Sequence, residues 1–191
     1  MVKALIFDCF GVLTTDYWKE FVGSLPAEQV EPARALMYDH DSARLTEAEL
    51  IDAVKKLTGQ APRGVEKLLN DEKIKNLELL DYIKRRKDSY KIGLLSNIGS
   101  NWIRDTFLSQ AEQSLFDDMI FSYETHLAKP DPEIFELMAE RLGVKPAECV
   151  LVDDSEGHCA AAAKLGTKTV IYENFEQMKH QLKPLLADSK G

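Results

Sequence analysis

The stretch VLVDDSEGHCAAAAKLG, residues 150–166, does most to decide the fold of this chain. It continues a short apolar run, 149–152, that we expect to form a buried strand. Two aspartates follow, and an alanine-rich helix is predicted over 157–165, with Gly166 as its C-cap. A strand, a polar turn and a helix in this order are typical of one unit of a parallel α/β sheet.

Four further apolar runs are short and mostly rich in β-branched or aromatic residues. The predicted strands cover residues 2–7, 91–95, 118–122, 149–152 and 169–172. Apolar residues recur at helical spacing over 132–142 and 175–186, so helices are predicted between and after the later strands. This alternation predicts an α/β fold: a Rossmann-like, three-layer core with helices on both faces of a mostly parallel sheet.

About 80 residues separate the first predicted strand from the second, far more than one crossover helix requires. The segment carries helix signals of its own: Pro26 opens a stretch to about Tyr38, and Thr46 with Glu49 forms a capping-box pattern before 50–57. A further short helix is predicted after Pro62, and residues 76–87 resemble the crossover helix into the second strand. We therefore expect residues 15–73 to form a small helical cap on a core made of residues 1–14 and 74–191.

The composition is that of an ordinary globular protein, with 45% apolar and 29% charged residues among 191. Its 24 Lys and Arg against 32 Asp and Glu give a formal charge of −8, which argues against nucleic acid or an anionic membrane as a general partner. No apolar run approaches the roughly 20 residues that span a bilayer, and the N-terminal residues are typical of a strand rather than a signal peptide. The three cysteines show no paired metal spacing. We expect a cytoplasmic protein with reduced thiols.

Polar residues follow the predicted strands at the edge where an open parallel sheet binds its ligands. In strand order they are Asp8, then Ser96 and Asn97, then Lys129 beyond a short loop, and then Asp153 and Asp154. An aspartate can attack phosphorus or carbon to form an acyl intermediate, and two adjacent carboxylates suit a hard cation. A serine hydroxyl can bind an oxyanion, and a lysine can neutralise a phosphate or a carboxylate. Each residue also has a structural alternative: a strand-end turn with Gly11, a helix cap, or a surface lysine.

Four motifs in this order resemble those of the haloacid dehalogenase-like hydrolases, and the resemblance covers nearly the whole chain. The matching segments are FDCFGVL, LLSN, AKPDPEIF and VLVDDSEGHCAAAAKLG. The helical insertion after the first motif matches the position of that family's α-helical cap. Chain size and the paired acids of the fourth motif are most similar to the short phosphatase branch of the family.

The resemblance implies a role for each residue at the strand ends. Asp8 would be the nucleophile and a ligand of Mg²⁺, and Asp153 and Asp154 would complete the carboxylate ligands. Ser96 and Lys129 would hold the phosphoryl oxygens, and Asn97 would orient the substrate. The implied substrate is a small phosphorylated molecule, over which the cap would close.

Phe10 departs from the pattern of the family's phosphatases, which usually carry a second Asp two residues after the nucleophile as a general acid and base. Its main-chain carbonyl could still bind the metal, but its side chain cannot transfer a proton. Three functions remain open. The first is a metal-dependent phosphatase whose leaving group needs little protonation, or in which another group substitutes. The others are a 2-haloacid dehalogenase, whose halide leaves without a proton, and a binding protein that has lost turnover.

Several residues are candidates for substrate contacts or for the missing proton transfer, each with a packing or surface role as the alternative. They are Tyr17, Arg34, Tyr38, His40 and Arg44 of the cap, and His158 of the fourth motif.

Overall fold

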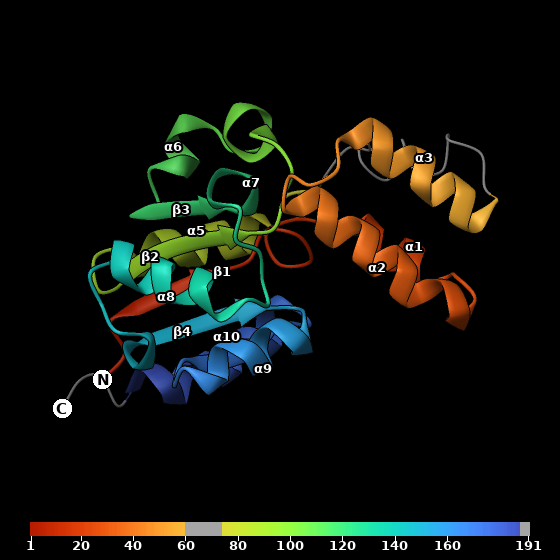
Figure 1. The fold of residues 1–191 in the computed structure, drawn as a ribbon. Helices are drawn as coiled ribbons and strands as arrows, with labels where there is room; N and C mark the ends of the chain where they lie inside the picture. Colours follow the sequence, from red (N-terminus) through yellow and green to blue (C-terminus); the bar gives the residue numbers. More distant parts are fainter. Residues whose placement is uncertain (60–73, 188–191) are drawn as a thin grey trace.

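One parallel sheet organises the protein. The computed structural model describes residues 1–59 and 74–187. Its strands are β1 (Ala4–Phe7), β2 (Lys91–Ser96), β3 (Asp118–Phe121), β4 (Cys149–Asp153) and β5 (Lys168–Ile171). They lie in the order β3-β2-β1-β4-β5, and every neighbouring pair is parallel (Figure 1). The central strands β1 and β4 are short and fully buried, which is why each appears in the sequence as a nearly continuous apolar run.

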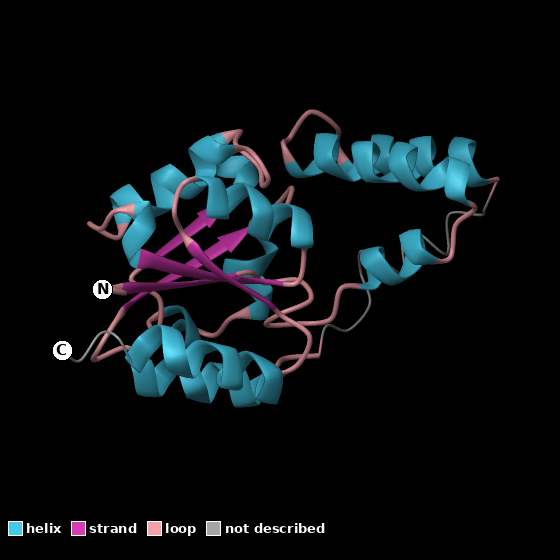
Figure 2. Cartoon of the chain, turned by 90° about the horizontal axis from the view of Figure 1, so that it is seen from below, coloured by secondary structure: helices cyan, strands magenta, loops and turns pink. Residues whose placement is uncertain are grey.

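Helices cover both faces of the sheet and make three layers (Figure 2). The helices α5 (Leu77–Arg86) and α10 (Phe175–Ala187) pack on one face, where they share an apolar cluster with Leu5 and Phe7 of β1. The helices α8 (Pro132–Arg141) and α9 (Glu156–Lys164) pack on the other face against Ala4 and Ile6. The shorter helical segments are the π-helix Ile103–Phe107, α6 (Gln110–Gln113), α7 (Ser122–Thr125) and the 3₁₀ turn Pro146–Glu148.

Within the described residues between β1 and α5, three helices stand apart from the sheet at the carboxyl ends of its strands (Figures 1 and 2). They are α1 (Tyr17–Gly23), α2 (Ala27–Asp41) and α3 (Glu47–Thr58). They bury an apolar cluster of their own, which includes Phe21, Leu50 and Val54. We call these three helices the cap. Its limits at 15 and 73 stay a prediction, and the helix predicted after Pro62 lies outside the described residues.

Most element boundaries differ from the predicted ones by one to three residues, because hydrogen bonding rather than apolarity ends an element. The first strand starts at Ala4 instead of residue 2, although Lys3 still donates its amide to Glu148. The predicted capping box of Thr46 and Glu49 is confirmed at the start of α3. No helix in residues 1–59 and 74–187 is long and apolar enough to cross a membrane.

The register of the sheet places the predicted site residues side by side. Phe7 of β1 is opposite Val152 of β4, so Asp8 and Asp153 follow at the same height. The amide of Asp8 donates to the carbonyl oxygen of Val152 at 2.9 Å, which continues the ladder to the first catalytic candidate. Two acids are thus fixed on adjacent strands before any side-chain contact is considered.

Candidate active site

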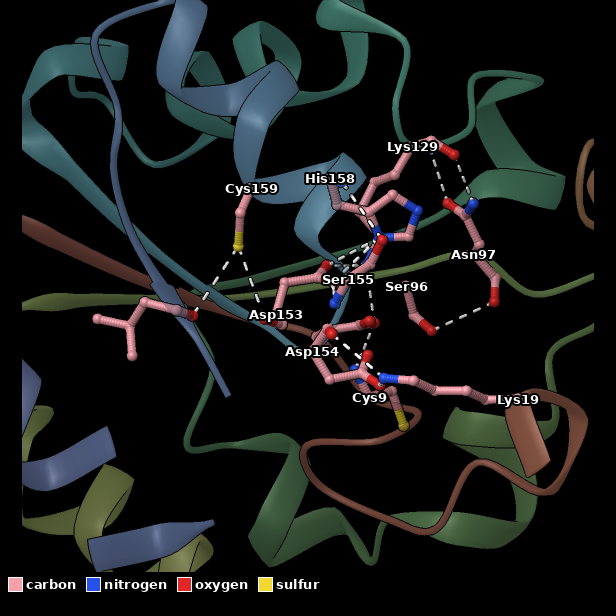
Figure 3. A network of polar contacts seen from close by, with 12 residues as sticks. Cys9, Lys19, Ser96, Asn97, Lys129, Asp153, Asp154, Ser155, His158 and Cys159 are labelled. Carbon is pink, nitrogen blue, oxygen red and sulfur yellow. Dashed lines mark hydrogen bonds and ion pairs between the residues drawn. The ribbon is translucent and has the colours of Figure 1, made fainter. Parts of the chain in front are cut away.

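Lys129 joins the two strand-end acids. Its Nζ lies 2.8 Å from Oδ1 of Asp8 and 2.7 Å from Oδ2 of Asp153, and its side chain is fully buried (Figure 3). Burial by itself would lower the pKa of Lys129, but the charges of Asp153 and Asp8 outweigh it and raise that pKa. The lysine is therefore held as a cation at neutral pH, which is what binding an anion in a dry site requires.

Asp153 is a fully satisfied carboxylate. Its Oδ1 accepts the amide of Ser155 at 2.9 Å and lies 3.0 Å from Nδ1 of His158. Ser155 caps the N-terminus of α9 through its side chain, which accepts the amide of His158. Burial would raise the pKa of Asp153, but Lys129 and then His158 outweigh it and lower that pKa. Asp153 is thus ionised, and it holds Lys129 in place.

Asp8 experiences opposing influences. Its Oδ1 accepts the amide of Cys9 at 2.6 Å. Burial and then the charge of Asp153 raise the pKa of Asp8, and Lys129 acts in the opposite direction. A nucleophilic carboxylate must be ionised, so further positive charge near Asp8 would favour its reactive form.

Asp154 connects the strand ends to the cap. Its Oδ2 lies 2.5 Å from Nζ of Lys19, which lies in the first turn of α1 and also reaches the main-chain oxygen of Asp154 at 3.2 Å (Figure 3). Gly11, at φ +79°, passes directly under it: a Cβ there would lie 2.5 Å from the Asp154 carboxyl carbon. The loop after β1 is thus shaped around this carboxylate, and only glycine fits both the conformation and the space.

Ser96 and Asn97 lie where β2 ends. Ser96 is fully buried and its hydroxyl is 3.5 Å from the main-chain oxygen of Asn97. The amide group of Asn97 pairs with the main chain of Lys129 twice, accepting from its N–H and donating to its C=O, each at 2.8 Å. Asn97 therefore positions Lys129. Its predicted contact with substrate stays a prediction.

The donor set at the strand ends fits a hard cation. Carboxylate oxygens of Asp8 and Asp154 and the main-chain carbonyl of Phe10 are the oxygen ligands that Mg²⁺ prefers. The ammonium of Lys19 already places a positive charge at Asp154. A second arrangement also has metal-ligand spacing: one ligand atom each from Asp8, Asp153 and His158 lie within 4.8 Å of one another.

Phe10 has an apolar role. Its ring stacks on Trp102 with a centroid separation of 6.2 Å, and Trp102 stacks on Phe107 at 5.1 Å. The side chain that replaces the usual acid thus packs with the π-helix Ile103–Phe107.

The cap candidates have different surroundings. Tyr38 donates to Oδ2 of Asp131 at 2.7 Å, while Arg44 stacks over the Tyr38 ring at 5.0 Å. His40 lies against the loop after β2, because a Cβ on Gly99 would be 2.6 Å from its ring. Arg34 pairs with its helix neighbour Glu31, and Tyr17 is half-buried at the start of α1. Lys19 was not among the predicted contacts, although it reaches the site most directly.

The fold and this cluster define a hydrolase-type site at the edge of a parallel sheet, in which an aspartate at a strand end is held by a buried lysine. The family model described as haloacid dehalogenase-like hydrolase matches residues 2–166, and the chain belongs to that family.

Relatives extend this likeness. A Bacillus subtilis (strain 168) protein named "Putative phosphatase YhcW" is 29% identical, over 97% of this chain and 93% of its own. A HAD family enzyme from Bacteroides thetaiotaomicron, solved with magnesium and inorganic phosphate, superposes with a TM-score of 0.66 at 26% identity, over 91% of this chain and 95% of its own. The (S)-2-haloacid dehalogenase 4A of Burkholderia cepacia is 27% identical over 53% of this chain and 48% of its own.

Proposed function

We propose that this hydrolase is a Mg²⁺-dependent phosphatase of small phosphorylated metabolites that acts through an aspartyl-phosphate on Asp8. The observation that carries the proposal is the contact of Asp8 and Asp153 with one buried ammonium, Lys129, at 2.8 and 2.7 Å. This places a nucleophile and an anion-binding cation at one point on the sheet edge. The relatives that are named as phosphatases, or solved with magnesium and phosphate, support it.

In the proposed reaction an Asp8 oxygen attacks phosphorus, and the bond from phosphorus to the leaving oxygen breaks. Water then attacks the phosphorus of the aspartyl-phosphate, which releases phosphate and restores the Asp8 carboxylate. Lys129 and the hydroxyl of Ser96 stabilise the phosphoryl oxygens during both displacements. Bound Mg²⁺ would neutralise charge between the attacking carboxylate and the phosphoryl group.

We assign the metal to Asp8, the Phe10 carbonyl and Asp154. Asp153 is not a ligand in this assignment but holds Lys129 in place. A divalent ion among Asp8, Asp153 and His158 would lie beside the ammonium of Lys129, and like charges at that range repel in a buried site. At Asp154 the charge already present belongs to Lys19, whose side chain is 61% exposed and is free to swing into water.

The dehalogenase alternative is supported by Phe10, because a halide leaves without a proton. The carboxylates of Asp153 and Asp154 weigh against it: together with Asp8 they outnumber the ammonium groups of Lys129 and Lys19, and this excess of negative charge would repel a carboxylate substrate. Phe10 also supports the binding-protein alternative, because its side chain cannot transfer a proton.

Phosphate release with Mg²⁺ tests the proposal. We expect the purified protein to hydrolyse at least one ester from a panel of sugar, acyl and aryl phosphates, and we expect EDTA to stop it. Asp8→Asn should remove the activity, while Asp81→Asn, on the exposed side of α5, should leave it unchanged. Halide release from 2-chloropropionate without metal would replace the phosphatase proposal by the dehalogenase. The absence of both reactions, together with tight binding of a metabolite, would favour the binding protein.

A further inference from the structure

Phe10 leaves the proposed reaction without a proton donor from the loop after β1. An alkoxide is a poor leaving group, so a phosphatase acting on alkyl esters needs an acid elsewhere. The acid must come from an element that reaches the strand ends. The cap does so at the last turn of α2.

That turn is docked on the core. The main-chain oxygen of Asp41, the last residue of α2, accepts the hydroxyl of Ser122 at 2.5 Å. Ser122 is fully buried directly after β3, and its hydroxyl also accepts the amide of Ile98 at 2.9 Å. The ring of His40 packs against Gly99 in the same loop. Asp41 is therefore fixed against the loop that starts with Ser96 and Asn97.

The Asp41 carboxyl is enclosed and nearly unpaired. Its side chain is 15% exposed, and among residues 1–59 and 74–187 its one ion-pair contact is Nδ1 of His40, at 3.7 Å. Burial raises the pKa of Asp41, and the neighbouring His40 opposes that rise. The charges of Lys129 and His158 reach the same carboxyl and also oppose the rise. The loop on which this turn is docked carries Asn97, which pairs with the main chain of Lys129, so the last turn of α2 lies beside the lysine that contacts Asp8.

We propose that Asp41 is the general acid and base of this enzyme, a carboxyl carried by the cap that replaces the missing acid at Phe10. Resting on the proposed phosphatase function, Asp41 gives its proton to the leaving oxygen as the bond from that oxygen to phosphorus breaks. The resulting carboxylate then takes a proton from the water that attacks the aspartyl-phosphate, which returns Asp41 to its starting state. His158 is less suited to this role, because its Nδ1 faces Asp153 at 3.0 Å.

Two esters that differ in their leaving group distinguish an acid from a structural residue. With Mg²⁺ present, we expect Asp41→Asn to lower kcat for an alkyl phosphate by about 10²–10⁴-fold. In the first turnover, release of nitrophenolate from p-nitrophenyl phosphate should slow by less than about tenfold, because nitrophenolate leaves without a proton. Later turnovers of both esters should slow together, because both share the water step that Asp41 also serves. Asp39→Asn is the matched control on the same helix: its side chain pairs with Arg44 and is 41% exposed, and both rates should stay unchanged.

The pH profile gives a second readout. For the alkyl ester, kcat of the wild type should fall as pH rises through the pKa of Asp41, because only the protonated carboxyl can donate. Asp41→Asn should lose that limb of the profile. Equal slowing of the first turnover of both esters, or a profile unchanged in the variant, would overturn the assignment. A wild type that releases phosphate from neither ester would instead refute the proposed function.

Discussion

Gly11 is the residue on which the shape of the metal site depends most. It combines a left-handed conformation with a carboxylate packed on its Cα, and either feature alone would disfavour a side chain. The sequence indicates a turn here, but it does not show that Asp154 lies on top of that turn, 143 positions further along the chain.

Gly11→Ala should weaken Mg²⁺ binding as well as stability. The left-handed conformation costs an alanine about 1–2 kcal/mol, and the new methyl group would displace the Asp154 carboxylate. Gly143→Ala is the control, since Gly143 has φ +71° and nothing within 4 Å of an added Cβ. Calorimetric titration with Mg²⁺ and urea unfolding measure the two effects. Equal Mg²⁺ affinity in both variants would contradict the placement of the metal at Asp154.

The positions of the strand-end residues were largely predictable from the sequence, and the contacts between cap and core were not. Asp8, Asp153 and Lys129 follow predicted strands, and the rule that parallel strands end at one edge brings them together. Asp41 and Lys19 follow no strand, and they meet Ser122 and Asp154 across 81 and 135 positions of the chain. A contact between residues so far apart in the chain leaves no periodic pattern in the sequence, so neither residue was predicted as part of the site.

At the scale of elements, α1 contacts the core through Lys19. Its positive charge takes the place at Asp154 that the proposed Mg²⁺ would take in the metal-bound enzyme. Burial would lower the pKa of Lys19, but its hydrogen bond and attraction to Asp154 raise it. The lysine is thus a cation paired with Asp154, one of the proposed metal ligands.

Lys19→Met should therefore bind Mg²⁺ more tightly, by up to about fivefold, the worth of a partly exposed ion pair. Lys55→Met, at an exposed position in α3, should bind like the wild type. Isothermal titration with MgCl₂ measures both. Weaker binding in Lys19→Met would mean that the ammonium organises the carboxylate rather than competing for it.

The start of β2 is fixed by a carboxylate on the neighbouring segment. Asp117 accepts the amide of Ile92 and the ammonium of Lys91, each at 2.9 Å. Burial would raise the pKa of Asp117, but these two contacts outweigh it and lower that pKa. A lowered pKa in the folded state means that the stabilisation is present above the unfolded pKa of about 4 and is lost as pH falls below it.

Asp117→Asn should lower the free energy of unfolding by about 1 kcal/mol at neutral pH, the usual worth of one such contact. The difference from wild type should shrink near pH 3, because below about pH 4 the unfolded chain binds a proton at Asp117 more readily than the folded protein does. Urea unfolding at the two pH values checks this, with exposed Asp88→Asn as the control. A difference that stays constant with pH would show that the charge of Asp117 contributes nothing.

At the scale of the whole molecule, the sequence indicated two bodies through one long gap between strands. The helical cluster of Phe21, Leu50 and Val54 is separate from both clusters that flank the sheet. The spacing of the predicted strands could not show how the cap and the core contact each other. They do so through polar contacts such as Tyr38 with Asp131 and Ser122 with Asp41, which are 93 and 81 positions apart.

This separation of clusters predicts that the cap can lose structure while the core keeps it. Leu50→Ala removes a fully buried side chain from the cap and should cost about 2–5 kcal/mol there. Amides of α3 should then exchange faster with deuterium, while those of β1 and β4 keep their protection. Leu95→Ala, in the cluster beneath the sheet, should instead expose the strand amides. If Leu50→Ala lowered protection in β4 as much as in α3, cap and core would unfold as one unit. In that case the cap could not separate from the core along its polar contacts, and Asp41 could not leave the site and return with the cap.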